Sequence, residues 1–235
     1  LFGLQLIGCV NRFRMWNDIS TLEQKKTKRR GLMLVLSSPS GAGKTTISRA
    51  LLERHNDLVI SISATTRPMR PGEEEGVHYH FIEQPHFDEM VAGDQFLEHA
   101  KVFNNSYGTL RQPVMDAIEV GQDVVFDVDW QGANQIRAKA IDDLVSIFIL
   151  PPSLKELEVR LRKRAQDTEA VVQRRMAMAS LEMSHWSEYE YIIVNDSIQN
   201  SIEKVDSILA AERLKRRRQI GLTYLVRQLG AGKES

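Results

Sequence analysis

Residues 32–45 restrict the possible folds of this chain more than any other segment. Leu32–Leu36 is a continuous apolar run, the pattern of a strand buried on both faces of a sheet. A short turn rich in Ser, Pro and Gly follows, and Thr45–Arg54 then reads as a helix with apolar residues at helical spacing. A strand, a turn of small residues and a helix in this order direct backbone N–H groups and a helix N-terminus toward one point. The segment therefore predicts an α/β fold with a loop that binds phosphate.

The residue types of this loop favour a nucleoside triphosphate. Small side chains let successive N–H groups surround a polyphosphate, while Lys44 supplies a cation to the β- and γ-phosphates and the Thr45 hydroxyl is a ligand for Mg²⁺. The predicted ATP-binding residues of the loop are Ser38, Pro39, Ser40, Gly41, Ala42, Gly43, Lys44, Thr45 and Thr46. The usual motif begins with Gly where this chain has Ser38. A glycine-rich turn that ends in Lys-Thr by chance is the alternative.

Strands and helices alternate along most of the remaining chain. Further strands are predicted at 59–64, 124–128, 145–150 and 191–194, and helices at 113–120, 130–139, 153–164, 169–183 and 201–218. This alternation predicts a P-loop NTPase-type parallel sheet covered by helices on both faces. Residues 65–110 break the rhythm with prolines, glycines and short aromatic runs, so we interpret them as a small inserted domain.

Two carboxylates follow the strand at 124–128. Asp127 and Asp129 lie where that strand leaves the sheet, and an unpaired carboxylate inside a strand would be costly. We therefore predict that they face the phosphate site and its metal ion. The alternative is that they cap the helix that begins near Trp130.

Composition limits the other classes of function. Of 235 residues, 42% are hydrophobic, and 31 Lys+Arg balance 31 Asp+Glu, which fits an ordinary soluble protein and disfavours disordered, collagen-like and coiled-coil chains. The single cysteine excludes a disulfide framework and a multi-cysteine zinc site, and a reducing cytoplasm is expected. Basic clusters at 25–30 and 213–218 are interpreted as solvated charge, with binding to nucleic acid or an anionic partner as the alternative.

The first thirty residues are left out of the predicted fold. The apolar stretch Leu1–Val10 is too short to span a bilayer. We expect residues 1–30 to be a flexible extension in which Leu1–Val10 lies upstream of a true start at Met15, and a fragment of a targeting peptide is the alternative for that stretch. Neither a membrane nor a nucleic acid is expected as a partner.

Several further motifs follow the phosphate loop along the chain. They are Ser63-Ala-Thr-Thr-Arg-Pro-Met-Arg-Pro-Gly-Glu73, Gly76-Val-His-Tyr-His-Phe81, Phe96-Leu-Glu-His-Ala100, Tyr107-Gly-Thr109 and Asp127-Val-Asp-Trp-Gln-Gly132. Together with the phosphate loop, they resemble the guanylate kinases, which transfer the γ-phosphate of ATP to GMP. The resemblance runs from about Gly31 to about Arg213. It implies an extension at 1–30, a core at 31–62, 113–152 and 185–218, a GMP-binding domain at 63–112, a lid at 153–184 and a tail at 219–235.

The resemblance also implies a GMP site. The phosphate of GMP is expected to contact Arg67, Arg70, Tyr79 and Tyr107. The base of GMP is expected to contact Ser63, Glu98 and Thr109, and Asp129 is expected in the same site. Asp127 is expected beside Thr45 at the metal ion. Arginine suits phosphate because it binds two oxygens at once, and a carboxylate suits the N1–H and 2-amino donors of guanine. The usual Tyr-Tyr-Gly triplet is Ser106-Tyr-Gly here, with the binding Tyr retained. Solvated surface arginines are the alternative for the Arg pair.

The lid is implied in the same way. Arg160, Arg164 and Arg175 match the arginines that close over the transferring phosphate, so together with Lys44 they form the predicted catalytic set. Ion pairs on a helix surface are the alternative, because Glu156 precedes Arg160 by four residues. Many relatives have Gly on both sides of Arg164, where this chain has Lys163 and Ala165, which stiffen a hinge. Asn195 is expected near the ATP base.

The resulting prediction is a Mg-dependent kinase acting on ATP and GMP, with a homo-oligomer left open. No histidine is assigned, because the phosphate of GMP is already ionised and positioning carries the reaction. Two alternatives stay open: an interaction module of the same fold without catalysis, and a kinase of the same architecture with a different phosphate acceptor. The intact Lys44 and Thr45 disfavour the first, and Glu98 disfavours the second.

Overall fold

The computed structural model describes residues 29–102, 104–164 and 169–231. The chain divides into two compact units, one spanning Arg30–Arg218 and the other made of Leu1–Arg29 with Gln219–Ser235. The larger unit holds every predicted site residue, and the smaller unit is described by itself below.

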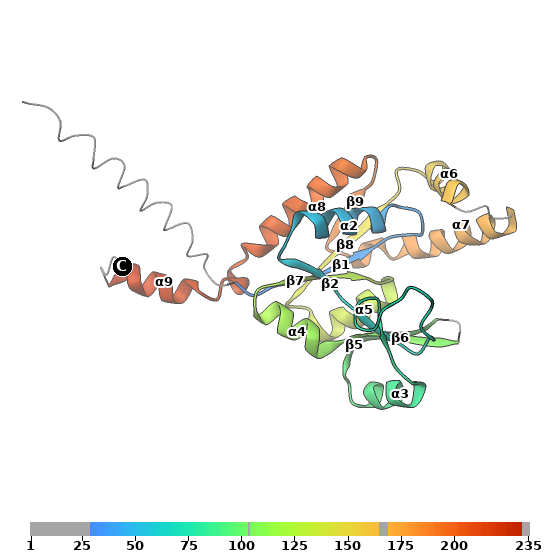
Figure 1. The fold of residues 1–235 in the computed structure, drawn as a ribbon. Coiled ribbons are helices and arrows are strands. Elements are labelled where there is room, and N and C mark those ends of the chain that lie inside the picture. The colour runs from blue at the N-terminus through green and yellow to red at the C-terminus, as the bar shows by residue number, and fades with distance from the viewer. Residues whose placement is uncertain (1–28, 103, 165–168, 232–235) are drawn as a thin grey trace, which may run out of the picture. The chain divides into compact units, whose positions relative to one another are not determined.

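A five-stranded parallel sheet forms the centre of the larger unit (Figure 1). Its order is β2 (Leu58–Ile60), β7 (Asp123–Asp127), β1 (Met33–Ser37), β8 (Leu144–Leu150) and β9 (Tyr191–Val194). Every pairing between these neighbours is parallel. The central strands are mostly apolar because helices cover both faces of the sheet, as the run at 32–36 predicted.

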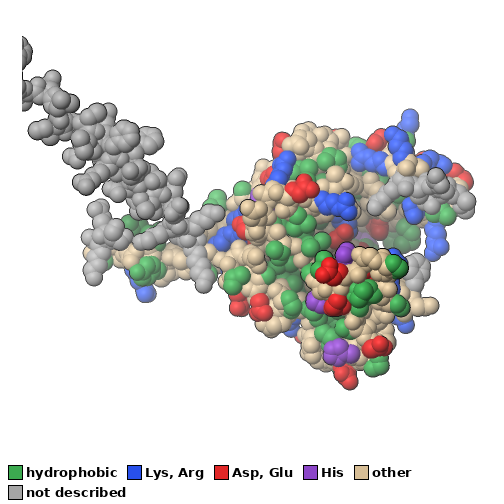
Figure 2. Space-filling view, in the orientation of Figure 1, with side chains coloured by type: hydrophobic (Ala, Val, Ile, Leu, Met, Phe, Trp, Pro, Cys, Tyr) green, Lys and Arg blue, Asp and Glu red, His purple; other side chains and the backbone are tan. Residues whose placement is uncertain are grey.

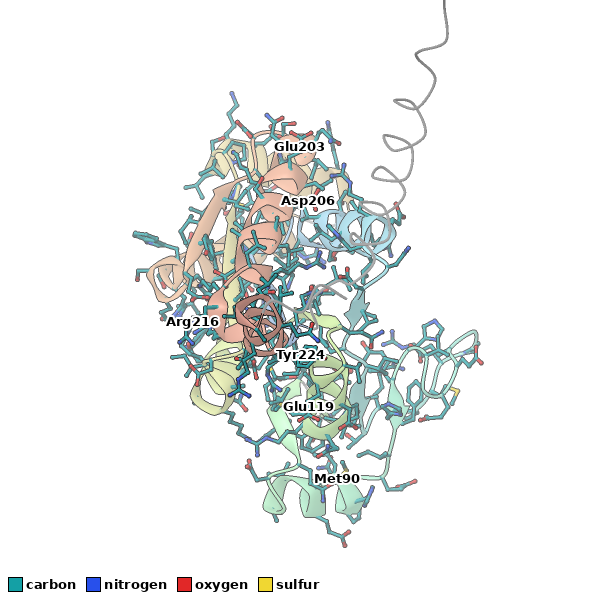
Figure 3. All side chains as sticks on the ribbon, turned by 90° about the vertical axis from the view of Figure 1, so that its left-hand side faces the viewer. Met90, Glu119, Glu203, Asp206, Arg216 and Tyr224 are labelled. Atoms are coloured by element: carbon teal, nitrogen blue, oxygen red, sulfur yellow. The ribbon has the colours of Figure 1, made fainter. Side chains whose placement is uncertain are left out.

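Four helices cover this sheet, two on each face (Figure 1). They are α2 (Lys44–Arg54) with α8 (Ile198–Arg213), and α4 (Arg111–Glu119) with α5 (Trp130–Ala140). Alternate residues of β1 enter different cores: Leu34 packs in the cluster that contains residues of α2 and α8, and Val35 in the cluster that contains residues of α4 and α5. Asp206 of α8 lies beside α2 (Figure 3), where its carboxylate accepts from Arg54 at 2.6 Å and contacts His55 at 2.9 Å.

A second, four-stranded sheet forms a small domain between β2 and α4. Its order is β4 (His80–Phe81), β3 (Ser63–Thr65), β6 (Asn105–Leu110) and β5 (Phe96–Val102), and α3 (Gln84–Ala92) packs against it. The prediction of one strand over 59–64 was wrong, because this stretch is divided between the two sheets. Ser61 still donates its N–H to Val125 of β7 at 3.0 Å, and Ser63 already pairs with Thr109 of β6.

Two helices, α6 (Leu154–Arg164) and α7 (Glu169–Ser184), follow β8, and η1 (Trp186–Glu188) then leads into β9. Their shared core is small and consists of Leu157 and Leu161 from α6 and Ala179 from α7, with Met176 at its edge. The Ser153 hydroxyl accepts the N–H of Glu156 at 3.1 Å, which is the cap expected where α6 begins.

The basic cluster at 213–218 corrects two predictions. First, α8 ends at Arg213, and Arg216–Arg218 form the short helix η2. Second, solvated charge is wrong for the two ends of the cluster: Arg213 donates to Asp123 and Asp57 at 2.7 and 2.8 Å, and Arg218 is 1% exposed.

Arg218 lies among groups that offset part of the cost of burying its charge. It donates to the Gly31 carbonyl at 3.3 Å and lies 3.6 Å from the buried Glu212 carboxylate. At the other cluster, Arg30 binds both oxygens of Asp143 at 2.8 Å, while residues 25–28 lie outside the described residues.

The smaller unit contains one described helix, α9 (Leu222–Gly230), in the stretch interpreted as a tail. Leu222, Leu225, Val226 and Leu229 recur at helical spacing along it, and Leu229 is 71% exposed. Among the residues that the structure describes, no helix combines the length and the apolar character needed to span a bilayer.

Candidate functional site

The predicted phosphate loop joins β1 to α2. Gly41 and Gly43 have φ angles of 90° and 104°, in the left-handed region that glycine adopts without strain. α2 begins at Lys44, immediately after Gly43, so the helix N-terminus faces the loop. The local sequence thus produces the backbone that an anion site needs.

Asn195 supports the loop from beneath. It is fully buried, its Nδ2 donates to the Ala42 carbonyl at 2.7 Å, and its Oδ1 accepts from the Ser201 hydroxyl at 3.0 Å. A Cβ added at Gly43 would collide with this amide, which gives a second reason for glycine there. In this structure Asn195, predicted to lie near the ATP base, contacts the loop that would hold the phosphates.

A cavity of about 750 Å³ opens over the loop. Its lining comprises Ser38, Pro39, Ser40, Gly41, Gly43, Lys44, Thr45, Thr46, Arg49, Asp127, Arg160, Glu182 and Ile198. The structure therefore brings most predicted ATP residues together with Asp127 and one predicted lid arginine. Sequence reasoning did not find Arg49, Glu182 and Ile198.

Lys44 and Asp127 meet in this cavity, with Nζ and Oδ1 2.5 Å apart. They come together because β1 and β7 are parallel neighbours and both end at this edge of the sheet. Asp127 remains 47% exposed, and the Thr45 side chain lines the same cavity. A carboxylate and a hydroxyl are the oxygen donors that Mg²⁺ takes from proteins when nucleotide phosphates and water complete its shell. The residues present therefore fit a magnesium ion that arrives with a nucleotide.

Glu182 brings a second carboxylate to the loop. Its Oε2 accepts the Ser40 N–H at 3.2 Å, so α7 contacts the anion-binding backbone directly. Burial raises the pKa of Glu182 above its usual range, although the Ser40 N–H and the charge of Lys44 act in the opposite direction. A phosphate at this N–H would have to displace the carboxylate.

Glu98, Thr109 and Ser63 form a second site in the small domain. The Thr109 hydroxyl donates to Glu98 Oε1 at 2.6 Å, and the Ser63 and Thr109 hydroxyls lie 3.5 Å apart. The strand register aligns them, since Thr109 of β6 pairs with Ser63 of β3 on one side and Glu98 of β5 on the other. Glu98 is only 7% exposed, so burial raises the pKa of its carboxyl, and the nearby negative charge of Asp129 adds to this.

The predicted GMP-phosphate residues lie in part together. Arg67 stacks over the Tyr79 ring at 5.4 Å, and the rings of Tyr79 and Tyr107 meet edge to face at 6.0 Å. Glu73, which sequence reasoning did not assign, holds Arg67 through two hydrogen bonds of 2.7 and 3.0 Å. These bonds, together with the backbone N–H of Arg70, lower the pKa of Glu73 to about 2. Arg70 is exposed, and its backbone N–H donates to Glu73.

Asp129 caps α5 and acts electrostatically on both groups of residues. Its Oδ1 caps α5 by accepting the N–H groups of Gln131 and Gly132, both at 3.0 Å, so the capping alternative is correct for this residue. Its charge also contributes to the raised pKa values of Glu98 in the small domain and Glu182 in the cavity. The phosphate loop and the Glu98 site are therefore electrostatic neighbours.

The predicted lid arginines have different surroundings. Arg160 lines the cavity and also donates to Glu156 at 3.1 Å, which combines the functional and the helix-surface interpretations. Arg175 lies on α7, half-buried, and is not among the described residues that line the cavity. Arg164 ends α6, but its side chain lies outside the described part of the chain. Lys and Arg side chains gather around α6 and α7 (Figure 2).

The chain is similar to known proteins in both sequence and structure. A family model described as guanylate kinase matches residues 30–212. A guanylate kinase of Paramagnetospirillum magneticum is 61% identical over 204 residues, covering 87% of this chain and 95% of that protein. One from Bradyrhizobium diazoefficiens is 59% identical over 202 residues, covering 86% and 92%. The crystal structure of guanylate kinase from Anaplasma phagocytophilum matches with a TM-score of 0.67 and 36% identity, covering 88% of this chain and 99% of that one.

Proposed function

The chain belongs to the guanylate kinase family and is a nucleoside monophosphate kinase, and we propose that it transfers the γ-phosphate of Mg-ATP to GMP or dGMP, with residue roles as follows. The products are ADP with GDP or dGDP. The oxygen of the acceptor phosphate forms the new P–O bond, and the bond between the β- and γ-phosphates of ATP breaks.

ATP binds with its phosphates in the loop at 38–46. The N–H groups around Gly41 and Gly43 and the N-terminus of α2 hold the polyphosphate, and Lys44 exchanges part of its contact with Asp127 for the γ-phosphate. Asn195 acts indirectly, since it keeps the loop in shape through Ala42.

Thr45 and Asp127 would hold the magnesium ion that comes with ATP, in the cavity that Lys44 also lines. Magnesium supplies positive charge to the phosphate oxygens when it is bound. The support for this role is the pair of oxygen donors in one cavity; among the residues that the structure describes, no cluster of three or more His, Cys, Asp or Glu forms a metal site without nucleotide.

GMP binds in the small domain. The phosphate of GMP is bound by Arg67, Arg70, Tyr79 and Tyr107. The hydrogen bonds from Arg67 to Glu73 keep the Arg67 side chain in position for this contact. At the other end, Glu98 accepts hydrogen bonds from the guanine N1–H and 2-amino groups, assisted by Ser63 and Thr109.

Guanine is selected because only a base with this pair of donors satisfies the buried Glu98. Adenine would leave the carboxylate with the Thr109 hydroxyl but without the two base donors, in a site where Glu98 is only 7% exposed. No side chain is assigned to the ribose 2′-hydroxyl in this proposal, so dGMP is expected to be a substrate as well.

Transfer then depends on positioning and charge. Arg160, Arg164 and Arg175 approach the γ-phosphate when α6 and α7 close as a lid, and they offset charge on its equatorial oxygens. Closure also excludes water, which would otherwise hydrolyse ATP. The small core between α6 and α7 and the contact of Glu182 with Ser40 support a lid that responds to the contents of the loop.

One observation carries this proposal: the short segment 127–132 contacts both the phosphate loop, through Asp127 and Lys44, and the surroundings of the buried Glu98, through Gly132. This supports a guanine-binding carboxylate and a triphosphate-binding loop that act together in one transfer.

The test is a coupled assay of ADP release by the full chain with Mg-ATP and GMP, dGMP, AMP, UMP or CMP. We expect turnover with GMP and dGMP only. ATP binding without transfer to any acceptor would indicate an interaction module, and equal turnover of AMP would refute guanine selection by Glu98.

A further inference from the structure

Glu98 stands at an irregular point of β5. The pairing of β5 with β6 shifts register between Phe96 and Glu98, and the intervening Leu97 is fully buried in the core shared with α4 and α5. A bulge interrupts the ladder and re-aims the side chains next to it. The ladder alone therefore fixes the backbone at Glu98 less firmly than it would in a regular strand.

Gln135 of α5 holds the residue that follows Glu98. Its Oε1 accepts the His99 N–H at 3.0 Å, and its Nε2 donates to the His99 carbonyl, also at 3.0 Å. β5 is an edge strand of the small sheet, so these backbone groups have no neighbouring strand on their outer side. A side-chain amide has one donor and one acceptor end, and here it replaces that strand for a single residue.

The same helix also binds the backbone of β5 just before Glu98. One turn after Gln135, Lys139 donates its Nζ to the Phe96 carbonyl at 2.6 Å. α5 thus binds the main chain of β5 on both sides of the bulge. Lys139 is further tied to Asp94, at 2.6 Å, in the turn before β5.

The N-terminal end of α5 is close to the guanine-reading group itself. The helix is capped by Asp129, and a Cβ added at Gly132 would lie 3.4 Å from Glu98 Oε2. The same helix therefore has Asp129 at its N-cap and carries Gln135, whose side-chain amide binds β5 next to Glu98. A displacement of β5 from α5 would change the position of Glu98 relative to Asp129.

From this geometry we propose that Gln135 is a positioning residue for guanine selection. By binding both backbone groups of His99 it fixes where the Glu98 carboxylate points. The proposal rests on the proposed function, since it concerns how well Glu98 meets GMP. Both described hydrogen bonds of the Gln135 side chain go to His99 and neither goes to a predicted ATP residue, so its loss should affect GMP binding and leave ATP binding unchanged.

The test replaces Gln135 by Met, which has similar length and removes both hydrogen bonds, and by Glu, which keeps one acceptor oxygen and sets the other against the His99 carbonyl. We expect both variants to raise the KM and the calorimetric Kd for GMP by about tenfold, comparable to the loss of one hydrogen bond. KM for ATP and kcat at saturating GMP should change less than about twofold.

Two further variants sharpen the result. Gln112→Met removes an exposed glutamine whose amide binds Asp116 on its own helix, and it should leave every constant unchanged. Lys139→Met should raise KM for GMP less than Gln135→Met does, because Phe96 lies on the other side of the bulge from Glu98.

A double-mutant cycle with Glu98→Gln separates positioning from general support of the fold. If Gln135 acts through Glu98, then Gln135→Met should change GMP affinity by less than about twofold when Glu98 is already Gln. Additive effects in the cycle, an unchanged KM for GMP, or an equal rise in KM for ATP would overturn the proposal. A wild-type protein that does not turn over GMP would instead refute the proposed function, so the two failures are distinguishable.

Discussion

Replacement of Glu98 by Gln changes one atom at the centre of the proposed guanine site. The Gln side chain keeps an oxygen that accepts from the Thr109 hydroxyl, which lies 2.6 Å from Glu98 Oε1. The second carboxylate oxygen becomes an NH₂ group. That group would face the N1–H and 2-amino donors of guanine, so a donor would meet donors where an acceptor stood.

The size of the effect follows from this exchange. A hydrogen bond to a charged group contributes about 1.5–3 kcal/mol, and the mismatched amide adds a further penalty because the site is buried. We therefore expect a loss of about 3 kcal/mol in GMP binding, equivalent to roughly a hundredfold rise in Kd. Calorimetry with GMP measures Kd directly, and KM for ATP provides the internal control.

Glu98→Gln should also stabilise the folded protein at neutral pH. Burial raises the pKa of Glu98, so its ionised form is less favourable in the folded chain than in the unfolded chain. The protonated carboxyl therefore stabilises the folded protein fully when the pH is below its ordinary pKa of 4.5. This stabilisation is lost as the pH rises through the higher pKa that the group has in the folded protein. The Gln variant has no such loss, so its Tm should exceed that of the wild type at neutral pH, and the difference should shrink toward pH 4.5.

The matched control is Glu203→Gln on the exposed surface of α8 (Figure 3), which should change neither Kd nor Tm. The reasoning is refuted if Glu98→Gln binds GMP as tightly as the wild type, or if its Tm falls at neutral pH.

Three further substitutions test the phosphate loop. Lys44→Ala should lower kcat by roughly a hundred- to a thousandfold, as loss of one charge-stabilising donor does, whereas exposed Lys204→Ala should not; normal turnover would contradict the role of Lys44. Gly43→Ala should lower Tm, because a left-handed alanine costs about 1–2 kcal/mol and its Cβ meets Asn195; an unchanged Tm would show that the loop has another conformation in solution. Glu182→Gln should tighten ATP binding about fivefold, since it removes a negative charge from the Ser40 N–H; weaker binding would argue that Glu182 assists ATP instead.

The fold of the core could be predicted because its signals are local. A strand buried on both faces needs a largely apolar run. Leu32–Leu36 is apolar without interruption, and residues 124–128 and 145–150 are apolar apart from Asp127 and Ser146. The division of residues 59–64 between two sheets has no such signal, since the stretch alternates like a single strand. Only the partners of Ser61 and Ser63, which come from β7 and β6, determine where the chain changes sheet.

The side-chain contacts of the charged cluster at 213–218 could not be predicted from the sequence either. Arg213 binds Asp123 and Asp57, which lie 90 and 156 residues away in the sequence. A run of like charges predicts a solvated surface when its neighbours are unknown, and the partners that bury Arg213 and Arg218 become visible only in the folded chain.

Some residues of the candidate site could likewise be predicted from the sequence, and others could not. The phosphate loop could be predicted, because one continuous segment supplies its backbone, its cation and its hydroxyl. Glu73, Glu182 and Gln135 could not be, since each acts through a contact that the tertiary structure creates. Glu182 and Gln135 lie on ordinary helices, where nothing in the spacing separates them from surface residues.

The most direct test of the central claim is phosphorus NMR of the full chain incubated with Mg-ATP and GMP. The account predicts that the β-phosphate signal of GDP appears in step with that of ADP while GMP disappears at the same rate, and that substitution of AMP for GMP abolishes both. Formation of ADP with inorganic phosphate and no GDP, or equal phosphorylation of AMP, would contradict it.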